Sequence, residues 1–393
     1  MIRRIILILV ILIIAEVYFY QAIKTLTSNS YILSGYWLLN FLLFAGIIGG
    51  VLLTRSGRVS QAALTSLLTV FLSVAIPKLA ASPIMLIEDF TRLFRGFPPR
   101  NIYVSEFAIA FALCIFAIVL FGLTRGKHFY RIRKETLHFP DLPEAFDGFT
   151  ITQISDIHVG SFTDKKGVEK GVTLANEQQS DLLLFTGDLV NHKASEMDDW
   201  IETFAQLNAH YGKYSVLGNH DYGDYIRWEN PSAKAINLER LKAIHREMGF
   251  RLLLNESVQL EKDGQSIALI GVENWGKGGF HQYGDIRKAT SGLSLDSFKV
   301  LLSHDPSHWD EVNTNFDQRI HLTLAGHTHG MQLGVELFGF KWSPIQYFYK
   351  NWAGLYNQEG KYLYVNRGFG YHGLKGRIGV WPEITVLTLR RSG

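Results

Sequence analysis

The stretch Gly218-Asn219-His220-Asp221 decides how this chain is interpreted. It follows the apolar run 214–217, so an amide, an imidazole and a carboxylate come directly after an expected strand. Comparable polar stretches follow other apolar runs: Asp156-Ile157-His158, Gly187-Asp188, Ser303-His304-Asp305 and Gly326-His327-Thr328-His329. Carboxylates, an amide and several imidazoles form the inventory that holds two divalent metals and leaves room for a phosphate. The pattern therefore predicts a phosphoester hydrolase.

The spacing within these stretches supports a shared metal site. A glycine precedes Asp188, Asn219 and His327, and it lets a strand turn sharply so that the next side chain points into a common cavity. His327 and His329 are two residues apart and share a face in an extended segment. Mixed oxygen and nitrogen ligands without thiolate suit Mn²⁺, Fe or Zn²⁺ rather than Ca²⁺. We expect two divalent metal ions as cofactors.

The apolar residues are unevenly spread. They make up 47% of the chain, and nearly all long uncharged runs fall within residues 1–124. Residues 125–147 are basic and contain two prolines, whereas residues 148–393 mix charges, glycine and aromatics as a globular domain does. The sequence predicts a transmembrane helical domain over 1–124, a basic juxtamembrane linker over 125–147 and a catalytic domain over 148–393.

The first domain contains four candidate membrane spans. Residues 36–54, 59–76 and 107–124 are uncharged and close to the roughly 20 residues that a spanning helix needs. A fourth candidate, 5–23, contains Glu16, which we expect to pair with Lys24 or a lipid headgroup. A signal peptide fits this segment less well, because no small-residue cleavage site follows it. Residues 83–97 are interpreted as an interfacial amphipathic helix or an ordered loop.

The charge distribution predicts how the chain is oriented in the membrane and argues against nucleic acid as a partner. With four spans, Arg55, Arg58 and the basic run after residue 124 fall on one side, which the positive-inside rule makes cytoplasmic. Cys114 is the single cysteine, so no intrachain disulfide demands an oxidising compartment. A net charge of +3 without a dense basic stripe does not indicate nucleic acid as a partner. We expect a multi-pass cell-membrane protein with a cytoplasmic catalytic domain.

Beyond residue 148, apolar strand patterns dominate the sequence. The first three expected strands, 150–154, 181–185 and 214–217, each end in a polar stretch, as sites in α/β sheets do. Helices separate the later strands less often; these strands are expected at 251–254, 266–271, 298–302, 321–324, 362–365 and 384–389. Two mixed sheets flanked by helices fit this order better than one doubly wound sheet.

The polar stretches follow the order D-x-H, GD, GNH[DE], a later His and GHxH. With this order of motifs, the chain resembles the calcineurin-like metallophosphoesterase superfamily over about residues 149–390. The ending 364–370, with Arg377 and 382–384, resembles its membrane-anchored branch, which includes enzymes similar to UDP-2,3-diacylglucosamine hydrolase. The resemblance implies an α/β fold: a four-layer αββα sandwich, preceded by an all-α bundle of about four transmembrane helices. It also implies one metal on Asp156, His158 and His329, a second on Asn219, His304 and His327, and Asp188 bridging both.

The mechanism that the resemblance implies is attack on phosphorus by a metal-bridging hydroxide. His220 would act as a general acid or as a hydrogen-bond donor at the leaving oxygen. Asn191 stands where many relatives carry aspartate, so either Asp221 orients His220 instead or the imidazole is less basic than in those relatives. Arg367 is interpreted either as a bidentate clamp for a phosphate oxygen or as a solvated turn residue.

Three functions remain open at this level. The first is hydrolysis of a phosphodiester or pyrophosphate bond in a phosphorylated, lipid-linked substrate at the membrane. The second is hydrolysis of soluble nucleotides or cyclic nucleotides, and the third is a non-catalytic membrane scaffold that retains the fold. The aromatic stretch 338–356 is interpreted as a contact with the membrane interface or an acyl chain, or as a lid over the core.

Overall fold

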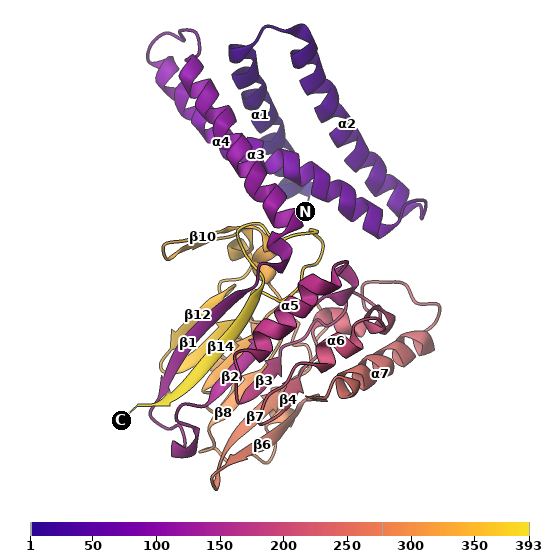
Figure 1. The fold of residues 1–393 in the computed structure, drawn as a ribbon, viewed down its shortest axis with the longest axis vertical. Coiled ribbons are helices and arrows are strands. Elements are labelled where there is room, and N and C mark those ends of the chain that lie inside the picture. Colours follow the sequence, from indigo (N-terminus) through magenta and orange to yellow (C-terminus); the bar gives the residue numbers. More distant parts are fainter. Residues whose placement is uncertain (1, 277, 393) are drawn as a thin grey trace. The chain divides into compact units, whose positions relative to one another are not determined.

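The computed structural model describes residues 2–276 and 278–392, so the predicted domain ends at residues 1 and 393 lie outside it. The chain divides into two compact units. One contains residues 1–124 with 373–375, and the other contains residues 125–372 with 376–393. We refer to them as the membrane unit and the catalytic unit (Figure 1).

The membrane unit is helical. Four helices of the described chain are long and apolar enough to cross a membrane, as predicted: α1 (Ile2–Leu26), α2 (Ser30–Arg55), α3 (Gln61–Leu93) and α4 (Ile102–Thr124). Asn29 caps α2 and Ser60 caps α3, because their side-chain oxygens accept N–H groups that lack a partner within the helix. Short polar caps in apolar surroundings therefore set where these two helices begin.

Helix α3 is longer than its predicted span. It continues through Pro77 and Pro83 to Leu93, so both interpretations of residues 83–97, a separate amphipathic helix and an ordered loop, are wrong for residues 83–93. Proline is tolerated within membrane helices because neighbouring groups satisfy the freed backbone atoms. The charges in this stretch form ion pairs: Arg92 lies 2.6 Å from Asp89, and Arg100, beyond the helix, lies 3.0 Å from Glu88 and 2.7 Å from Asp89.

A buried polar cluster joins three of the membrane helices. The Lys78 Nζ atom lies 2.9 and 2.8 Å from the two carboxylate oxygens of Glu16, and 2.6 Å from Asn40 Oδ1. Tyr36 also donates its hydroxyl to Glu16. The expected pairing of Glu16 with Lys24 or a headgroup is therefore wrong, because a lysine from α3 satisfies the carboxylate inside the bundle.

The catalytic unit contains two six-stranded mixed sheets. The first has the order β1 (Arg131–Phe139), β14 (Glu383–Arg391), β2 (Thr150–Ile154), β3 (Leu182–Phe185), β4 (Lys213–Ser215) and β5 (Phe250–Leu252). The second has the order β12 (Gly354–Gln358), β13 (Lys361–Val365), β9 (Leu322–Ala325), β8 (Lys299–Leu302), β7 (Gln265–Gly271) and β6 (Glu256–Lys262). A separate hairpin is formed by β10 (Val335–Leu337) and β11 (Phe340–Trp342).

Helices cover the outer faces of both sheets. Figure 1 shows α5 (Lys165–Asn176), α6 (Ile201–Ala205) and α7 (Pro231–Glu247) on one side of the first sheet. Their apolar side chains share a core with that sheet, while α8 (Ile286–Ala289) and α9 (His308–Asn315) supply residues to a core on the second sheet. A third core fills the space between the sheets. The predicted αββα sandwich after a helical membrane bundle is confirmed.

The segment expected to be a linker contributes a strand. Residues 131–139 form β1, which pairs in parallel with β14 from Arg131 to Phe139. Leu137 and Phe139 are fully buried in the core between the sheets. The expected linker over 125–147 therefore includes an edge strand of the first sheet, because its apolar residues are covered by the sandwich.

Candidate metal centre

Both sheets send polar residues to one site. Asp156 and His158 follow β2, Asp188 follows β3 and Asn219 begins the short helix after β4, all from the first sheet. From the second sheet, His304 follows β8, and His327 and His329 follow β9. Side chains at the carboxyl ends of neighbouring strands meet at one edge of a sheet, so this arrangement follows from the strand order.

The backbone at these positions is unusual. Five non-glycine residues of the site have left-handed φ angles: Asp156 (51°), His158 (48°), Asp188 (60°), His327 (70°) and His329 (50°). Such conformations cost on the order of 1–3 kcal/mol each and persist only where surrounding contacts impose them. Their concentration on the predicted ligands indicates that the loops are held in shape for a site.

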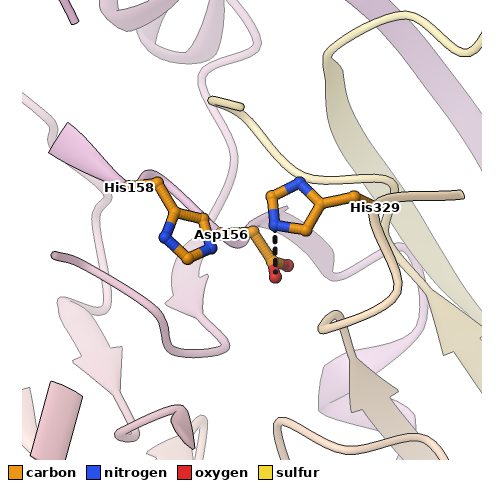
Figure 2. A group of neighbouring side chains, drawn as sticks. All are labelled: Asp156, His158 and His329. Atoms are coloured by element: carbon orange, nitrogen blue, oxygen red, sulfur yellow. Dashed lines mark ion pairs between the residues drawn. The ribbon is translucent and has the colours of Figure 1, made fainter. Parts of the chain in front are cut away.

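Three of the predicted ligands form a first group. Donor atoms of Asp156, His158 and His329 all lie within 4.8 Å of one another, and all three residues are buried. Figure 2 shows the two imidazoles with the carboxylate of Asp156 between them, and His329 Nε2 is 3.3 Å from Asp156 Oδ1. These residues share a small space that a single cation fits.

A second group lies beside the first. Donor atoms of Asp188, His304 and His327 also lie within 4.8 Å of one another. Asn219 Oδ1 faces the same point, 2.8 Å from His327 Nδ1 and 3.2 Å from His304 Nε2. The second group therefore combines carboxylate, amide and imidazole donors.

Asp188 connects the two groups. Its Oδ2 atom lies 3.3 Å from His158 Nε2 and 3.2 Å from His304 Nε2. One carboxylate oxygen therefore faces a histidine of each group.

The donor set fits divalent cations. One ring nitrogen of each of three histidines already has a partner. His158 Nδ1 lies 3.1 Å from Asn191 Oδ1, and His304 Nδ1 lies 2.8 Å from the carbonyl oxygen of Thr186. His327 Nε2 lies 2.8 Å from the Tyr349 hydroxyl. A ring nitrogen fixed in this way leaves the other to ligate a metal. His329 Nε2 is buried and has no hydrogen-bond partner among the described residues. A cation would satisfy these atoms.

Burial shapes the protonation of the site. It lowers the pKa of His158 and of His327 to about 4, so both imidazoles are neutral and able to ligate. Burial and the nearby charge of Asp188 raise the pKa of Asp156 to about 6. Burial alone would raise the pKa of Asp188. The neighbouring His304 and His220 outweigh this effect and hold the pKa of Asp188 well below its usual range.

His220 lies at the edge of both groups. One of its ring nitrogens is within 4.8 Å of donor atoms of His158 and Asp188. Its Nδ1 atom lies 2.8 Å from the carbonyl oxygen of Asn191, and its backbone N–H donates to Asp188 Oδ1 at 2.9 Å. The imidazole is therefore oriented by a backbone carbonyl.

The structure gives Asp221 a different role from the predicted one. Its buried carboxylate accepts four backbone N–H groups at 2.8 to 3.3 Å, those of Gly218, Asp188, Leu189 and Val190. Within the described residues, no hydrogen bond joins the side chains of Asp221 and His220. The expected orientation of His220 by Asp221 is wrong, because Asp221 holds together the two loops that carry Asp188 and Asn219.

Arg367 is also placed differently from either interpretation. Its Nε lies 2.6 Å from Glu336 Oε1 and its Nη1 lies 2.5 Å from Glu383 Oε2, and only 7% of the residue is exposed. The guanidinium is thus neither solvated nor free to clamp a phosphate. Both interpretations of Arg367 are wrong, because it neutralises two carboxylates within the fold.

Sequence reasoning gave no role at the site to two residues that the structure places there. The His372 ring stacks on His158 with centroids 4.7 Å apart, and its Nδ1 lies 3.1 Å from Asn191 Oδ1. Arg377 is fully buried and places Nη2 3.0 Å from His329 Nδ1. Both follow the glycine-rich ending 364–370, and that proximity is the signal that could have drawn attention to them.

A two-sheet sandwich with a histidine-rich candidate metal centre, in a chain with membrane helices, is the arrangement of a membrane-linked metallophosphoesterase. Residues 149–331 match the family model described as calcineurin-like phosphoesterase, and residues 2–127 match one described as probable calcineurin-like phosphoesterase, transmembrane domain. The chain belongs to the calcineurin-like phosphoesterase family. It is a membrane protein and a metal-dependent phosphoester hydrolase, which confirms those two predictions.

Two curated relatives illustrate the match. The uncharacterized metallophosphoesterase YkuE of Bacillus subtilis is 30% identical over 268 residues, which cover 67% of this chain and 87% of YkuE. A transmembrane protein with metallophosphoesterase domain from Danio rerio is 27% identical over 292 residues, which cover 72% of this chain and 62% of that protein. The name of the second relative mentions membrane segments, and the name of the first does not.

Proposed function

We propose that this protein hydrolyses a phosphodiester or pyrophosphate bond of a lipid-linked substrate at the cytoplasmic face of the membrane, with two divalent cations. One observation supports the use of two cations: Asp188 Oδ2 lies 3.3 Å from His158 Nε2 and 3.2 Å from His304 Nε2. A carboxylate in that position can serve two cations at once.

The proposal assigns each ligand to one of two positions. Asp156, His158 and His329 would hold one cation, and Asn219, His304 and His327 the other, with Asp188 shared. When bound, cations such as Mn²⁺, Fe or Zn²⁺ would act as Lewis acids on the phosphoryl oxygens and acidify the attacking water. The mixed oxygen and nitrogen donor set supports these metals.

His220 is proposed to hand a proton to the leaving oxygen. Its Nδ1 lies 2.8 Å from the Asn191 carbonyl, which can only accept a hydrogen bond, so Nδ1 keeps its proton there. The Nε2 atom is then the one that gains and loses a proton during turnover. Asn191 thereby contacts three imidazoles, because its side-chain oxygen also lies 3.1 Å from the Nδ1 atoms of both His158 and His372.

The lipid-linked substrate is supported by the attachment of the catalytic unit. Four apolar helices keep this unit next to a bilayer, so a substrate confined to the membrane meets the site without diffusing through solution. The cytoplasmic face is supported by Arg55 at the end of α2 and Arg58 between α2 and α3, and by the basic residues after α4, which fall on the same side.

The test is an assay of the full-length protein in lipid nanodiscs with Mn²⁺. Lipid pyrophosphates, bis-aryl phosphodiesters and soluble nucleotides are compared by kcat/KM. We expect hydrolysis that depends on the metal and is fastest for the lipid-linked substrate. A higher kcat/KM for nucleotides would contradict the lipid part, and inactivity with Mn²⁺, Fe²⁺ and Zn²⁺ alike would contradict the proposed chemistry.

A further inference from the structure

The hairpin of β10 and β11 has one apolar face and one polar face. Its register pairs Val335 with Trp342 and Leu337 with Phe340, while Glu336 pairs with Lys341. Because successive side chains of a strand point to opposite faces, the two apolar pairs lie on one face and the charged pair on the other.

The polar face of the hairpin is the one that packs against the catalytic unit. Glu336 lies 2.6 Å from Arg367 Nε and 2.7 Å from Arg133 Nη2. Lys341 donates to the carbonyl oxygen of Ala353 at 2.6 Å. Three ionic or polar contacts therefore tie the charged face to the catalytic unit, with Lys341 still exposed, and leave the opposite face on the other side of the hairpin.

The apolar face of the hairpin points away from the part of the catalytic unit that its charged face contacts. Leu337 is 58% exposed and Phe340 is 62% exposed. A hairpin on a water-facing surface has the reverse arrangement, with apolar residues toward the core and charges toward solvent. Figure 1 shows β10 in a projection at one end of the catalytic unit. This face is therefore built to contact something apolar.

The turn of the hairpin strengthens this conclusion. Phe338 is 98% exposed and has a φ of 49°, and Gly339 follows with a φ of 83°. Positive φ at both central positions of a two-residue turn favours Asn, Asp or Gly, so a phenylalanine is unfavourable there. Tyr347 and Phe348, which follow the hairpin, are also exposed. An aromatic residue that is both strained and exposed indicates a contact outside the chain.

The covalent chain keeps the hairpin near a bilayer. Arg133, which contacts Glu336 of the hairpin, lies nine residues after Thr124, the last residue of the membrane helix α4. Nine extended residues span at most about 30 Å, so the Cα atom of Arg133 can lie no further than this from the end of α4. Phenylalanine and tryptophan favour the boundary between headgroups and acyl chains.

We propose that the hairpin 335–342 inserts its apolar face into the bilayer surface, with Phe338 as the deepest residue. The segment that continues from the hairpin reaches the metal centre, because the Tyr349 hydroxyl lies 2.8 Å from His327 Nε2. Insertion would present the centre to lipid headgroups. This last consequence rests on the proposed lipid-linked substrate, whereas the insertion itself does not.

A depth measurement tests the insertion without any substrate. Phe338→Cys in a Cys114→Ser background is labelled with an environment-sensitive fluorophore in the full-length protein. Ile236→Cys, an exposed apolar position on α7, is the matched control. In nanodiscs that contain spin-labelled phospholipid, we expect the label at 338 to shift to shorter wavelength and to lose most of its fluorescence, while the control label keeps an aqueous spectrum.

Two results would overturn the proposal. One is an aqueous spectrum at position 338 in nanodiscs. The other is a shielded label that the spin-labelled lipid does not quench, which would mean that a second copy or another protein covers the hairpin. Neither result depends on turnover, so either can be distinguished from a failure of the proposed function.

Activity provides a second readout. We expect Phe338→Ser with Phe340→Ser to lower kcat/KM for a lipid phosphoester in nanodiscs about tenfold, a difference of about 1.4 kcal/mol. Turnover of a soluble aryl phosphodiester by the same variant should match the parent, which shows that the variant folds. Equal losses on both substrates would contradict a membrane role for the hairpin.

Discussion

The carboxylate of Asp221 accepts the backbone N–H of Asp188 at 2.9 Å, so one aspartate fixes the position of another. The same carboxylate accepts the N–H of Gly218 at 2.8 Å, the residue before Asn219. Two ligands of the second group are thereby held by a residue that need not touch metal or substrate. This relationship explains why Asp221 follows His220 in the decisive stretch.

Asp221→Asn should weaken metal binding. The amide retains one acceptor oxygen and loses the charge, so the two loops lose part of their support. We expect metal affinity to fall by about 10–100-fold, the usual effect of changing a residue that orients ligands. Manganese titration by calorimetry measures it. The control is Asp224→Asn, whose carboxylate pairs with Lys234 instead. Unchanged affinity together with lost turnover would instead place Asp221 in the reaction.

His220→Ala should separate catalysis from metal binding. Loss of a general acid lowers turnover by about 10²–10⁴-fold, and the remaining ligands keep the metals. Metal content by mass spectrometry and turnover are measured on the same sample. His192→Ala is the control, because its ring lies 6.0 Å from His220 and outside both ligand groups. A fall in metal content along with activity would reassign His220 as a ligand.

Arg367→Ala should affect stability rather than substrate binding. Removal of the guanidinium leaves Glu383 fully buried without its cation, which destabilises by about 3–5 kcal/mol. Chemical unfolding and KM for a soluble phosphodiester are measured together. Arg390→Ala removes an exposed pair with Asp147 and should change the free energy of unfolding by less than about 1 kcal/mol. A raised KM with unchanged stability would restore the phosphate-clamp interpretation.

The polar cluster in the membrane unit gives a double-variant test. Lys78→Met leaves the Glu16 carboxylate without its cation and should destabilise by about 3–5 kcal/mol. Glu16→Gln combined with Lys78→Met removes both charges and should recover most of that loss. The unfolding temperature of the full-length protein in detergent measures both. A double variant no more stable than the single one would show that the two residues do not act as a pair.

The sequence predicted the parts of the fold and site that depend on local pattern. Long apolar runs, three of them uncharged, identified four membrane helices, and strands that end in polar stretches indicated the sandwich. Asp156, Asp188 and His304 could be proposed as ligands because the short polar stretches that contain them, each shortly after an apolar strand, resemble the motifs of the family. Such signals lie within a few residues, so they need no knowledge of tertiary contacts.

What the sequence could not predict depends on distant contacts. Strand β1 carries charged residues that resemble a linker, and only its pairing with β14 makes it part of the sheet. Arg367 and Asp221 were misinterpreted because their partners, Glu336 and the N–H groups after Gly187, lie elsewhere in the chain. His372 joins the site from a segment far from every metal motif. These roles follow from the fold and not from spacing.

The most direct test of the account is anomalous scattering from crystals of the protein grown with manganese. The account predicts two peaks, one at Asp156, His158 and His329 and one at Asn219, His304 and His327, with Asp188 contacting both. No peak in the cleft, or a single ion served by either group alone, would contradict it.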